Sequence, residues 1–216
     1  MKLVTIYGGS GFLGRHVARR MAQAGWRVRV AVRRPAEAGF VRTYGRVGQV
    51  EPVLFNIRDD ASVAAAMSGA DAVVNAIGIL AEGGRNSFEA IQNEGPARVS
   101  RLAAVAGIER VVHISAIGAD ADSKSGYART KALGEEAVRS HVQSAVILRP
   151  SIMFGSGDSF FNRFAGLTRF GPVLPIVGGE TLFQPVYVDD VAMAVAKSVL
   201  GQVAAGTYEL GGPEVD

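Results

Sequence analysis

The chain has 216 residues, of which 48% are hydrophobic and 27 are glycine, and its formal net charge at pH 7 is only +3. Its arginines are dispersed, which argues against a nucleic-acid-binding protein, and no apolar run reaches the ~20 residues of a membrane span. The absence of cysteine excludes disulfides and thiolate metal sites. We expect a globular α/β protein without a metal or a transmembrane segment and, because Met1 leads directly into an apolar strand, without a signal peptide.

The first predicted strand runs directly into a glycine-rich turn. Residues 3–7 are β-branched or apolar, as in a buried parallel strand, and residues 12–24 have the apolar periodicity of a helix. The turn holds three glycines at three-residue spacing, which allow a tight turn, close approach of a pyrophosphate and close helix–strand packing. A strand-to-helix turn without a ligand is the alternative, but the order of strand, turn and helix favours a nucleotide phosphate at the helix N-terminus. The predicted phosphate-binding residues are Gly8, Gly11, Phe12, Leu13 and Gly14.

The residues after the second predicted strand, 26–32, bear on the choice of nucleotide. In NAD-binding proteins with this turn, an acidic residue ~20 positions further on binds the ribose 2′-hydroxyl. Arg33 and Arg34 stand there instead, and a guanidinium suits a 2′-phosphate. We therefore expect NADP(H), with NAD(H) as the alternative if both arginines are only solvated loop residues. Arg15 is a further candidate partner for phosphate.

A weak helix or loop is predicted over residues 36–47, a third strand over 51–55 and a fourth over 72–76. Small or polar residues follow the third and fourth strands, and ligands gather at the carboxyl ends of strands in doubly wound sheets. Asp59 would either accept a hydrogen bond from an adenine amino group or cap the helix that begins near Asp60. The residues expected to line a dinucleotide here are Asn56, Ile57, Asn75, Ala76, Ile77 and Gly78.

A long helix is predicted over residues 86–106, where the apolar spacing indicates core packing. A fifth strand over 110–115 precedes a polar loop and a helix that runs from Tyr127 to about Ser140. Tyr127 and Lys131 are one turn apart on one face of this helix. Such a pair is common on any helix, but its position after the fifth strand favours a functional role. A nearby ammonium would lower the pKa of the phenol and suit it to acid–base catalysis.

The last part of the chain predicts a sixth strand over residues 145–148, a helix over 160–170, a strand over 181–188, a helix over 191–200 and a strand over 207–210. The aromatic face of the helix over 160–170 would pack in the core or line an apolar ligand. Asp189 and Asp190 are better explained as a helix cap and dipole partner than as a metal site. We expect residues 1–216 to form one domain, in which about 151–187 supply substrate-side elements.

Four segments together are similar to a known superfamily. They are Gly11-Phe-Leu-Gly-Arg15, Tyr127-Ala-Arg-Thr-Lys-Ala-Leu-Gly-Glu135, Arg169-Phe-Gly-Pro172 and Gln184-Pro-Val-Tyr-Val188. With Leu148-Arg149-Pro150 and Asp189-Asp190, they resemble the extended and atypical short-chain dehydrogenase/reductases. The likeness is closest to the NAD(P)H-binding accessory subunit of respiratory complex I and its bacterial relatives.

The resemblance implies a doubly wound parallel sheet, the Rossmann fold, with NADPH across its carboxyl edge. It also places Tyr127 and Lys131 at the nicotinamide ribose and Pro150 near the ring. Catalytic members use a serine after the fifth strand to polarise a carbonyl, and Ser115 is the candidate. If that serine belongs two positions further on, Ile117 has replaced it, and carbonyl reduction would be impaired.

The resemblance leaves two main functions open. One is an NADP(H)-binding protein of the complex I accessory type, whose nucleotide is mainly structural or regulatory. The other is an active NADPH-dependent oxidoreductase that reduces a carbonyl with Tyr127 as general acid; an isomerase or dehydratase is a third. Complex I subunits are the expected partners, in the bacterial cytoplasm or the equivalent matrix-side compartment, and peripheral to the membrane through the partner. Because extended members continue past the last strand, we expect a minimal or truncated C-terminal substrate lobe.

Overall fold

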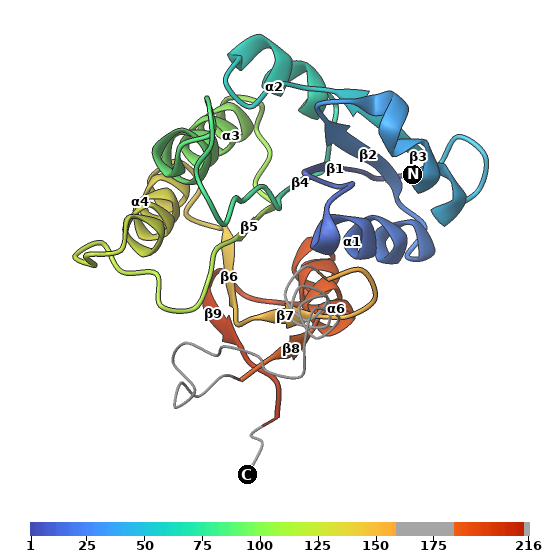
Figure 1. Ribbon diagram of the computed structural model, residues 1–216. Helices are drawn as coiled ribbons and strands as arrows, with labels where there is room; N and C mark the ends of the chain where they lie inside the picture. The colour runs from blue at the N-terminus through green and yellow to red at the C-terminus, as the bar shows by residue number, and fades with distance from the viewer. Residues whose placement is uncertain (159–183, 214–216) are drawn as a thin grey trace.

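The computed structural model describes residues 1–158 and 184–213, and a parallel sheet forms its centre (Figure 1). Seven strands lie in the order β3-β2-β1-β4-β5-β6-β9, and every neighbouring pair is parallel. They are β1 Leu3–Tyr7, β2 Arg27–Val32, β3 Val50–Leu54, β4 Ala72–Asn75, β5 Val111–Ile114, β6 Val146–Pro150 and β9 Gly206–Leu210. The strand order reverses at β1 and β4, which is where doubly wound sheets bind ligands. The predicted α/β fold class is confirmed.

Helices cover both faces of this sheet (Figure 1). One face carries α1 Phe12–Gln23 and α6 Val188–Val199, and the other carries α2 Asp60–Met67, α3 Glu94–Val105 and α4 Gly126–His141. Successive residues of β1 point into opposite cores: Ile6 packs with α1 and α6, and Tyr7 packs with α2. Because both faces are buried, the central strands β1, β4 and β5 are almost continuously apolar, whereas β2, nearer the edge, alternates Arg27 and Arg29 with valine.

The predicted long helix over residues 86–106 is wrong in one respect, because its first part is not α-helical. Glu89–Asn93 forms a π-helix, η2, and α3 begins only at Glu94. Pro96 lies in the first turn of α3 and has no N–H with which to bond the carbonyl of Gln92, one turn earlier. The regular hydrogen bonding of the α-helix, between residues four apart, is therefore interrupted at this point. The backbone here takes the wider turn of a π-helix, in which the bonded residues are five apart.

Two weaker predictions are refined by the structure. In place of the weak helix or loop predicted over 36–47, a 3-10 helix, η1, runs over Pro35–Tyr44. A strand was predicted over 181–188. Among its described residues, 184–188, only Val186–Tyr187 form a strand, β8, which pairs with the short strand β7 Met153–Phe154. Val188 already begins α6. The helix predicted over 160–170 lies outside the described residues.

Acidic residues at two helix starts have different roles. Asp59 is the N-cap of α2, and its carboxylate accepts a hydrogen bond from the N–H of Ala61 at 3.1 Å, so the capping alternative is confirmed. Tyr187 is the N-cap of α6, so the predicted cap at Asp189 and Asp190 is wrong, but both lie in the first turn, where the predicted interaction with the helix dipole is confirmed. Asp189 lies within the first turn of α6 and accepts two hydrogen bonds from Arg20 of α1, at 2.9 and 2.6 Å. It therefore joins two helices on the same face of the sheet, which lowers its pKa.

Candidate functional site

The glycine turn between β1 and α1 is built by close backbone contacts. Gly8 has a φ of +77°, which a residue with a Cβ rarely adopts, and a Cβ there would lie 3.0 Å from the carbonyl oxygen of Ala76. A Cβ on Gly14 would lie 2.6 Å from the Cα of Gly9, so only glycine lets α1 pack this closely. The predicted tight turn and helix–strand packing are confirmed.

The N-terminus of α1 is suited to an anion. Gly11 is the N-cap, and no side chain among the described residues accepts a hydrogen bond there. The first N–H groups of a helix have no intrahelical acceptor, and they carry the partial positive charge of the helix dipole. The backbone around Phe12, Leu13 and Gly14 therefore offers donors to a phosphate, although the Leu13 side chain itself is buried in the core.

A cavity of about 260 Å³ lies beside this turn at the carboxyl ends of β1 to β4. The predicted residues in its lining are Gly8, Gly11, Arg33, Ile57, Ala76, Ile77 and Gly78. Phe55, Arg58 and Asn86 also line it, and none of them was predicted as a site residue. Arg58 donates to the Asn86 side chain at 2.9 Å and to the carbonyl of Arg85, and it thereby holds the β4–η2 loop against the cavity.

Eight of the predicted cofactor residues line neither this cavity of the described structure nor the larger one beside it: Phe12, Leu13, Gly14, Asn56, Asn75, Tyr127, Lys131 and Pro150. Asn75 is buried at the end of β4, and its Nδ2 lies 3.4 Å from Nδ1 of His113. Asn56 is exposed, and its side chain accepts a hydrogen bond from the N–H of Arg58 at 3.1 Å. Pro150 is buried at the end of β6. The structure gives Asn56 and Asn75 local roles in shaping the backbone around the cavity.

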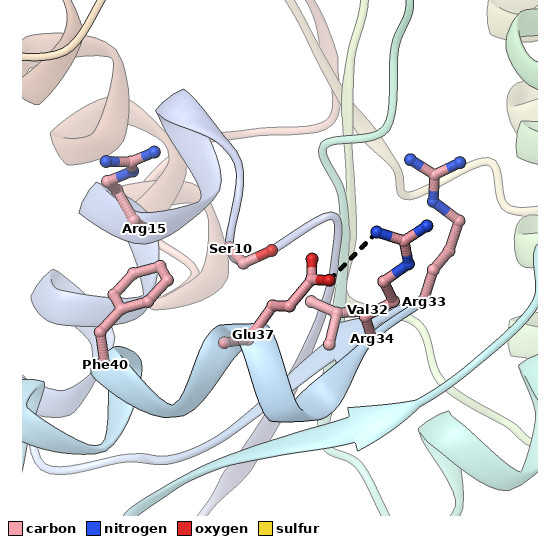
Figure 2. Close-up of a pocket in the computed structure, with 8 residues that line it drawn as sticks. Ser10, Arg15, Val32, Arg33, Arg34, Glu37 and Phe40 are labelled. Carbon is pink, nitrogen blue, oxygen red and sulfur yellow. Dashed lines mark hydrogen bonds and ion pairs between the residues drawn. The ribbon is translucent and has the colours of Figure 1, made fainter.

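A larger cavity of about 610 Å³ adjoins the first and shares Ser10, Val32 and Arg33 with it. Figure 2 shows arginine side chains on its two sides, Arg15 from α1 and the Arg33–Arg34 pair from the end of β2. Together they make this end of the site strongly positive. The predicted phosphate partners Arg15, Arg33 and Arg34 therefore line one cavity.

The arginines of this larger cavity differ in their present contacts. Arg34 forms an ion pair with Glu37 at 3.0 Å, and both side chains are largely exposed (Figure 2). Arg15 donates to the carbonyl of Gly11 at 3.2 Å, and its guanidinium lies 5.8 Å from the ring centre of Phe40. Glu37 and Phe40 were not predicted as site residues, because they lie in a segment whose pattern was ambiguous between helix and loop.

The second half of the site lies where α4 crosses the end of β5. Tyr127 is half-buried, and its ring meets Phe88 edge-on with 5.7 Å between ring centres. Lys131 is buried, and its Nζ donates to the carbonyl of Ile114 at 3.2 Å. The same Nζ lies 3.5 Å from where a Cβ on Gly78 would stand, so Lys131 reaches the cavity wall after β4.

The pKa of Tyr127 contradicts the sequence prediction. Burial raises this pKa above the ordinary value of a phenol, whereas the prediction was that Lys131 lowers it. Burial lowers the pKa of Lys131 to about 8, and the carboxylate of Glu135 opposes that shift. The prediction failed because the ammonium is directed at the Ile114 carbonyl and because removal of the phenol from water favours its neutral form.

Ser115 is the remaining predicted catalytic residue. It is only 3% exposed, and its Oγ has no hydrogen-bond partner among the described residues. Nε2 of His113 is likewise buried and unpartnered in the described structure, and burial lowers the pKa of His113 to about 3, which keeps it neutral. Ile117, two residues beyond Ser115, is 46% exposed. The exposed position at the end of β5 therefore carries an aliphatic side chain instead of a hydroxyl.

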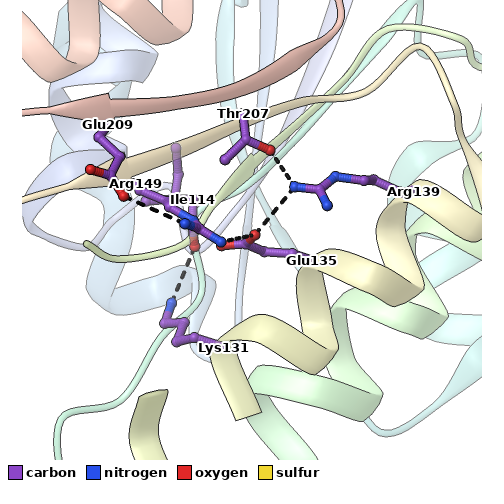
Figure 3. A network of polar contacts seen from close by, with 7 residues as sticks. All are labelled: Ile114, Lys131, Glu135, Arg139, Arg149, Thr207 and Glu209. Atoms are coloured by element: carbon purple, nitrogen blue, oxygen red, sulfur yellow. Dashed lines mark hydrogen bonds and ion pairs between the residues drawn. The ribbon is translucent and has the colours of Figure 1, made fainter. Parts of the chain in front are cut away.

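A buried ion-pair network holds α4 in place (Figure 3). The carboxylate of Glu135, whose side chain is 2% exposed, accepts two hydrogen bonds from Arg149 of β6 at 2.8 and 2.9 Å. Arg139 also donates to Glu135 and to Thr207 of β9, while Arg149 reaches Glu209 at 3.4 Å. The network joins the helix of Tyr127 and Lys131 to the last two strands of the sheet.

Comparison with known proteins agrees with this geometry. Residues 4–211 match the model of the NAD dependent epimerase/dehydratase family. The chain belongs to this family. Its glycine turn, switch-point cavity and Tyr–Lys helix are therefore parts of an NAD-binding fold.

Relatives of this family member include respiratory-chain subunits and a reductase. It is 38% identical to NADH dehydrogenase [ubiquinone] 1 alpha subcomplex subunit 9, mitochondrial, of Arabidopsis thaliana, over 99% of the chain and 54% of that protein. It is 34% identical to the ceramide reductase of Caulobacter vibrioides, over 88% of the chain and 58% of that protein. The chain thus spans little more than half the length of these curated relatives. The predicted likeness to the complex I accessory subunit is confirmed.

The fold is also that of solved enzymes. The Bordetella bronchiseptica enzyme WbmG in complex with NAD matches with a TM-score of 0.76 at 17% identity, over 97% of this chain and 72% of that one. Within residues 1–158 and 184–213, no helix is both long and apolar enough to cross a membrane. No group of three or more His, Asp or Glu side chains in the same residues could hold a metal ion.

Proposed function

We propose that this protein binds NADP(H), with the diphosphate over the turn at Gly8 to Gly14 and the adenosine 2′-phosphate between Arg33 and Arg34. The observation that carries the proposal is the pair of adjoining cavities, one against the glycine turn and the other lined by three arginines. A carboxylate at Arg33 would repel a 2′-phosphate, whereas a guanidinium can bind it through two parallel hydrogen bonds. NAD(H) would use the same turn but would gain little from these arginines.

The residues present fit such a nucleotide. Glycine at positions 8, 11 and 14 brings backbone close to the cavity, and the uncapped start of α1 supplies N–H donors. Ala76, Ile77 and Gly78 are small or apolar and line the cavity beyond the diphosphate. Lys131 would donate to the nicotinamide ribose from the far side of Gly78.

We further propose that the bound nucleotide serves mainly a structural or regulatory role, as part of an assembly of complex I subunits. Three features support binding without efficient turnover: the pKa of Tyr127 is raised, the Ser115 hydroxyl is buried, and Ile117 occupies the exposed position after β5. A ligand that binds only the folded state stabilises it by mass action, with no reaction needed. The similarity to NADH dehydrogenase subunits supports complex I as the partner, on the matrix side in mitochondria or the cytoplasmic side in a bacterium.

Nucleotide titration tests the binding proposal. We expect NADPH to bind at least about tenfold more tightly than NADH, because a charge-assisted bidentate contact is worth over 1 kcal/mol. Arg33→Ala should remove most of this preference, whereas Arg19→Ala, an exposed arginine of α1 outside both cavities, should leave it unchanged. Equal affinities in the parent protein would contradict the role of the arginines.

Co-purification tests the partner. The tagged protein should retain quinone-reductase subunits together with its nucleotide, and denaturation followed by mass spectrometry should identify that nucleotide as NADP(H). A protein recovered without complex I subunits from respiring cells would contradict the accessory role but not nucleotide binding.

A second candidate function is an NADPH-dependent carbonyl reductase. The burial of Lys131 one turn from Tyr127 and the similarity to a ceramide reductase favour it. When bound, the reduced nicotinamide would supply a hydride to the carbonyl carbon. Tyr127 would donate its phenolic proton to the carbonyl oxygen, and Lys131 would hold the ribose. The products are an alcohol and oxidised nucleotide.

Turnover separates the two candidates. With a panel of aliphatic ketones as probes, the structural role predicts NADPH oxidation far below the ~10 s⁻¹ typical of enzymes. Ordinary enzymatic rates that fall at least about a hundredfold in Tyr127→Phe would establish the reductase instead. Unchanged rates in that variant would exclude Tyr127 as the acid.

A further inference from the structure

Gln92 is a buried glutamine whose amide bridges two segments of the site. It is 1% exposed, and its Nε2 donates to the carbonyl of Ile79 at 2.7 Å. Its Oε1 lies 3.1 Å from Oγ1 of Thr130, which is itself buried. The carbonyl of Ile79 can only accept, so it fixes the orientation of the amide, and the hydroxyl of Thr130 is the donor to Oε1.

The backbone around Gln92 explains how the side chain reaches both partners. Gln92 lies in the π-helix η2, where Pro96 supplies no N–H to the Gln92 carbonyl. That carbonyl packs against α4 at Gly134, where a Cβ would overlap its oxygen. Glycine at 134 therefore allows η2 to lie directly on α4. Such π-helical segments occur frequently at functional sites.

Gln92 joins two segments that would lie on opposite sides of the nicotinamide: the segment 76–79 and the helix α4. Ile79 ends the segment 76–79 that lines the smaller cavity. Thr130 is adjacent to Lys131 on α4, and its hydroxyl also lies 2.8 Å from the Gly126 carbonyl and 3.2 Å from that of Tyr127. Nζ of Lys131 in turn lies 3.5 Å from where a Cβ on Gly78 would stand. The amide of Gln92 therefore holds the cavity wall at a set distance from the helix of the Tyr–Lys pair.

We infer that Gln92 is a positioning residue that fixes the segment 76–79 relative to Tyr127 and Lys131, and so shapes the binding site for the nicotinamide riboside half of the nucleotide. This inference rests on the proposed NADP(H) binding. It assigns Gln92 no contact with the nucleotide itself. The adenosine half, which the arginine-lined cavity would hold, does not depend on this bridge.

Two probes separate the halves of the site. Adenosine 2′,5′-diphosphate carries the adenosine and its 2′-phosphate, and NADPH adds the nicotinamide riboside. In Gln92→Leu we expect NADPH to bind about tenfold more weakly, because the Ile79 carbonyl loses its donor and the link between the segment 76–79 and Thr130 is broken. Affinity for adenosine 2′,5′-diphosphate should change less than twofold. The fluorescence enhancement of NADPH on binding, which reports the surroundings of the nicotinamide, should diminish in the variant.

Gln49→Leu is the matched control. The amide of Gln49 also bridges two segments, because its Nε2 donates to the carbonyls of Ala22 and Trp26 at 2.6 and 3.0 Å, outside both cavities. A merely structural role for Gln92 would make both variants lose thermal stability and leave the ratio of the two probe affinities unchanged. Thr130→Val, which keeps the side-chain shape, should reproduce part of the NADPH loss, and Thr130→Ser should restore it.

The outcomes distinguish this inference from the function on which it rests. If the parent protein binds neither probe, NADP(H) binding itself is wrong. If it binds both but Gln92→Leu weakens them equally, or weakens neither, the positioning role is wrong and the binding proposal stands. If Gln92→Leu does not fold, the Thr130 pair decides by the same ratio of affinities.

Discussion

The two ends of the proposed nucleotide site are built differently. At the adenosine end, a cavity of about 610 Å³ is lined by three exposed or partly exposed arginines, and the ion pair Arg34–Glu37 in its lining is solvent-exposed. At the nicotinamide end, Lys131, Glu135 and Gln92 are buried, and each is hydrogen-bonded. Exposed charges can recruit a nucleotide at little structural cost, whereas buried polar groups are costly unless paired. A single substitution should therefore disturb the fold far more at the nicotinamide end than at the adenosine end.

Removal of the Glu135 carboxylate should have the largest effect and should be confined to the nicotinamide end. Glu135→Ala leaves Arg149 without its principal partner, and we expect a loss of about 3 kcal/mol in the free energy of unfolding. Glu37→Ala, which breaks the exposed pair at the other end, should cost less than about 1 kcal/mol. Urea denaturation measures both. Similar losses in the two variants would remove the distinction between the ends.

A single methyl group at the turn should affect both ends together. In Gly14→Ala the new Cβ meets backbone of Gly8 and Gly9, and overpacking of this kind costs about 1–3 kcal/mol. Nucleotide affinity should fall as well, because the helix start must move. Gly39→Ala, where the nearest atom would be 3.9 Å away, is the control and should preserve affinity and melting temperature. An unchanged melting temperature in Gly14→Ala would mean that the turn is not tightly packed.

The pH dependence of stability should report the burial of Lys131. Its pKa is about 8 in the folded protein and near its ordinary value of 10.5 when unfolded, so the unfolded chain binds more protons between these values. Stability should therefore rise with pH from about 8 to 10.5, by at most about 1.4 kcal/mol per pH unit. In Lys131→Met this rise should disappear. Over the same range NADPH affinity should fall in the parent protein, because the neutral amine donates to the ribose more weakly.

The smallest expected effect is a gain in affinity at the adenosine end. Glu37→Gln frees Arg34 from its ion pair, and we expect NADPH to bind up to about threefold more tightly with no change in stability, because exposed pairs are worth at most about 1 kcal/mol. Glu51→Gln is the control, since it frees Arg42 from an exposed pair outside the cavity. A loss of NADPH affinity in Glu37→Gln would show that Glu37 contributes to binding instead of competing for Arg34.

Much of the fold and of the adenosine end could be predicted from the sequence. The strands of the sheet, α1, α4 and the glycine turn follow from apolar periodicity and glycine spacing, which act over a few residues. Arg33 and Arg34 were identified because their distance from the turn in the chain reflects one βαβ unit. The π-helix was missed because its cause, Pro96, lies inside an otherwise regular helical pattern. The opposite shift of the Tyr127 pKa was missed because sequence spacing places Lys131 near the phenol but says nothing of burial.

The sequence by itself determined the local backbone: which segments form parallel strands, where a tight turn requires glycine, and which helix carries the Tyr–Lys pair. Only the tertiary structure decided which polar groups meet. Asp189 pairs with Arg20, 169 positions earlier in the chain. Gln92 joins Ile79 to Thr130, which lies 38 positions after Gln92. The physical reason is that backbone conformation depends on neighbours within a turn or a strand. Burial and pairing of polar side chains depend on contacts between segments that meet only when the sheet has formed.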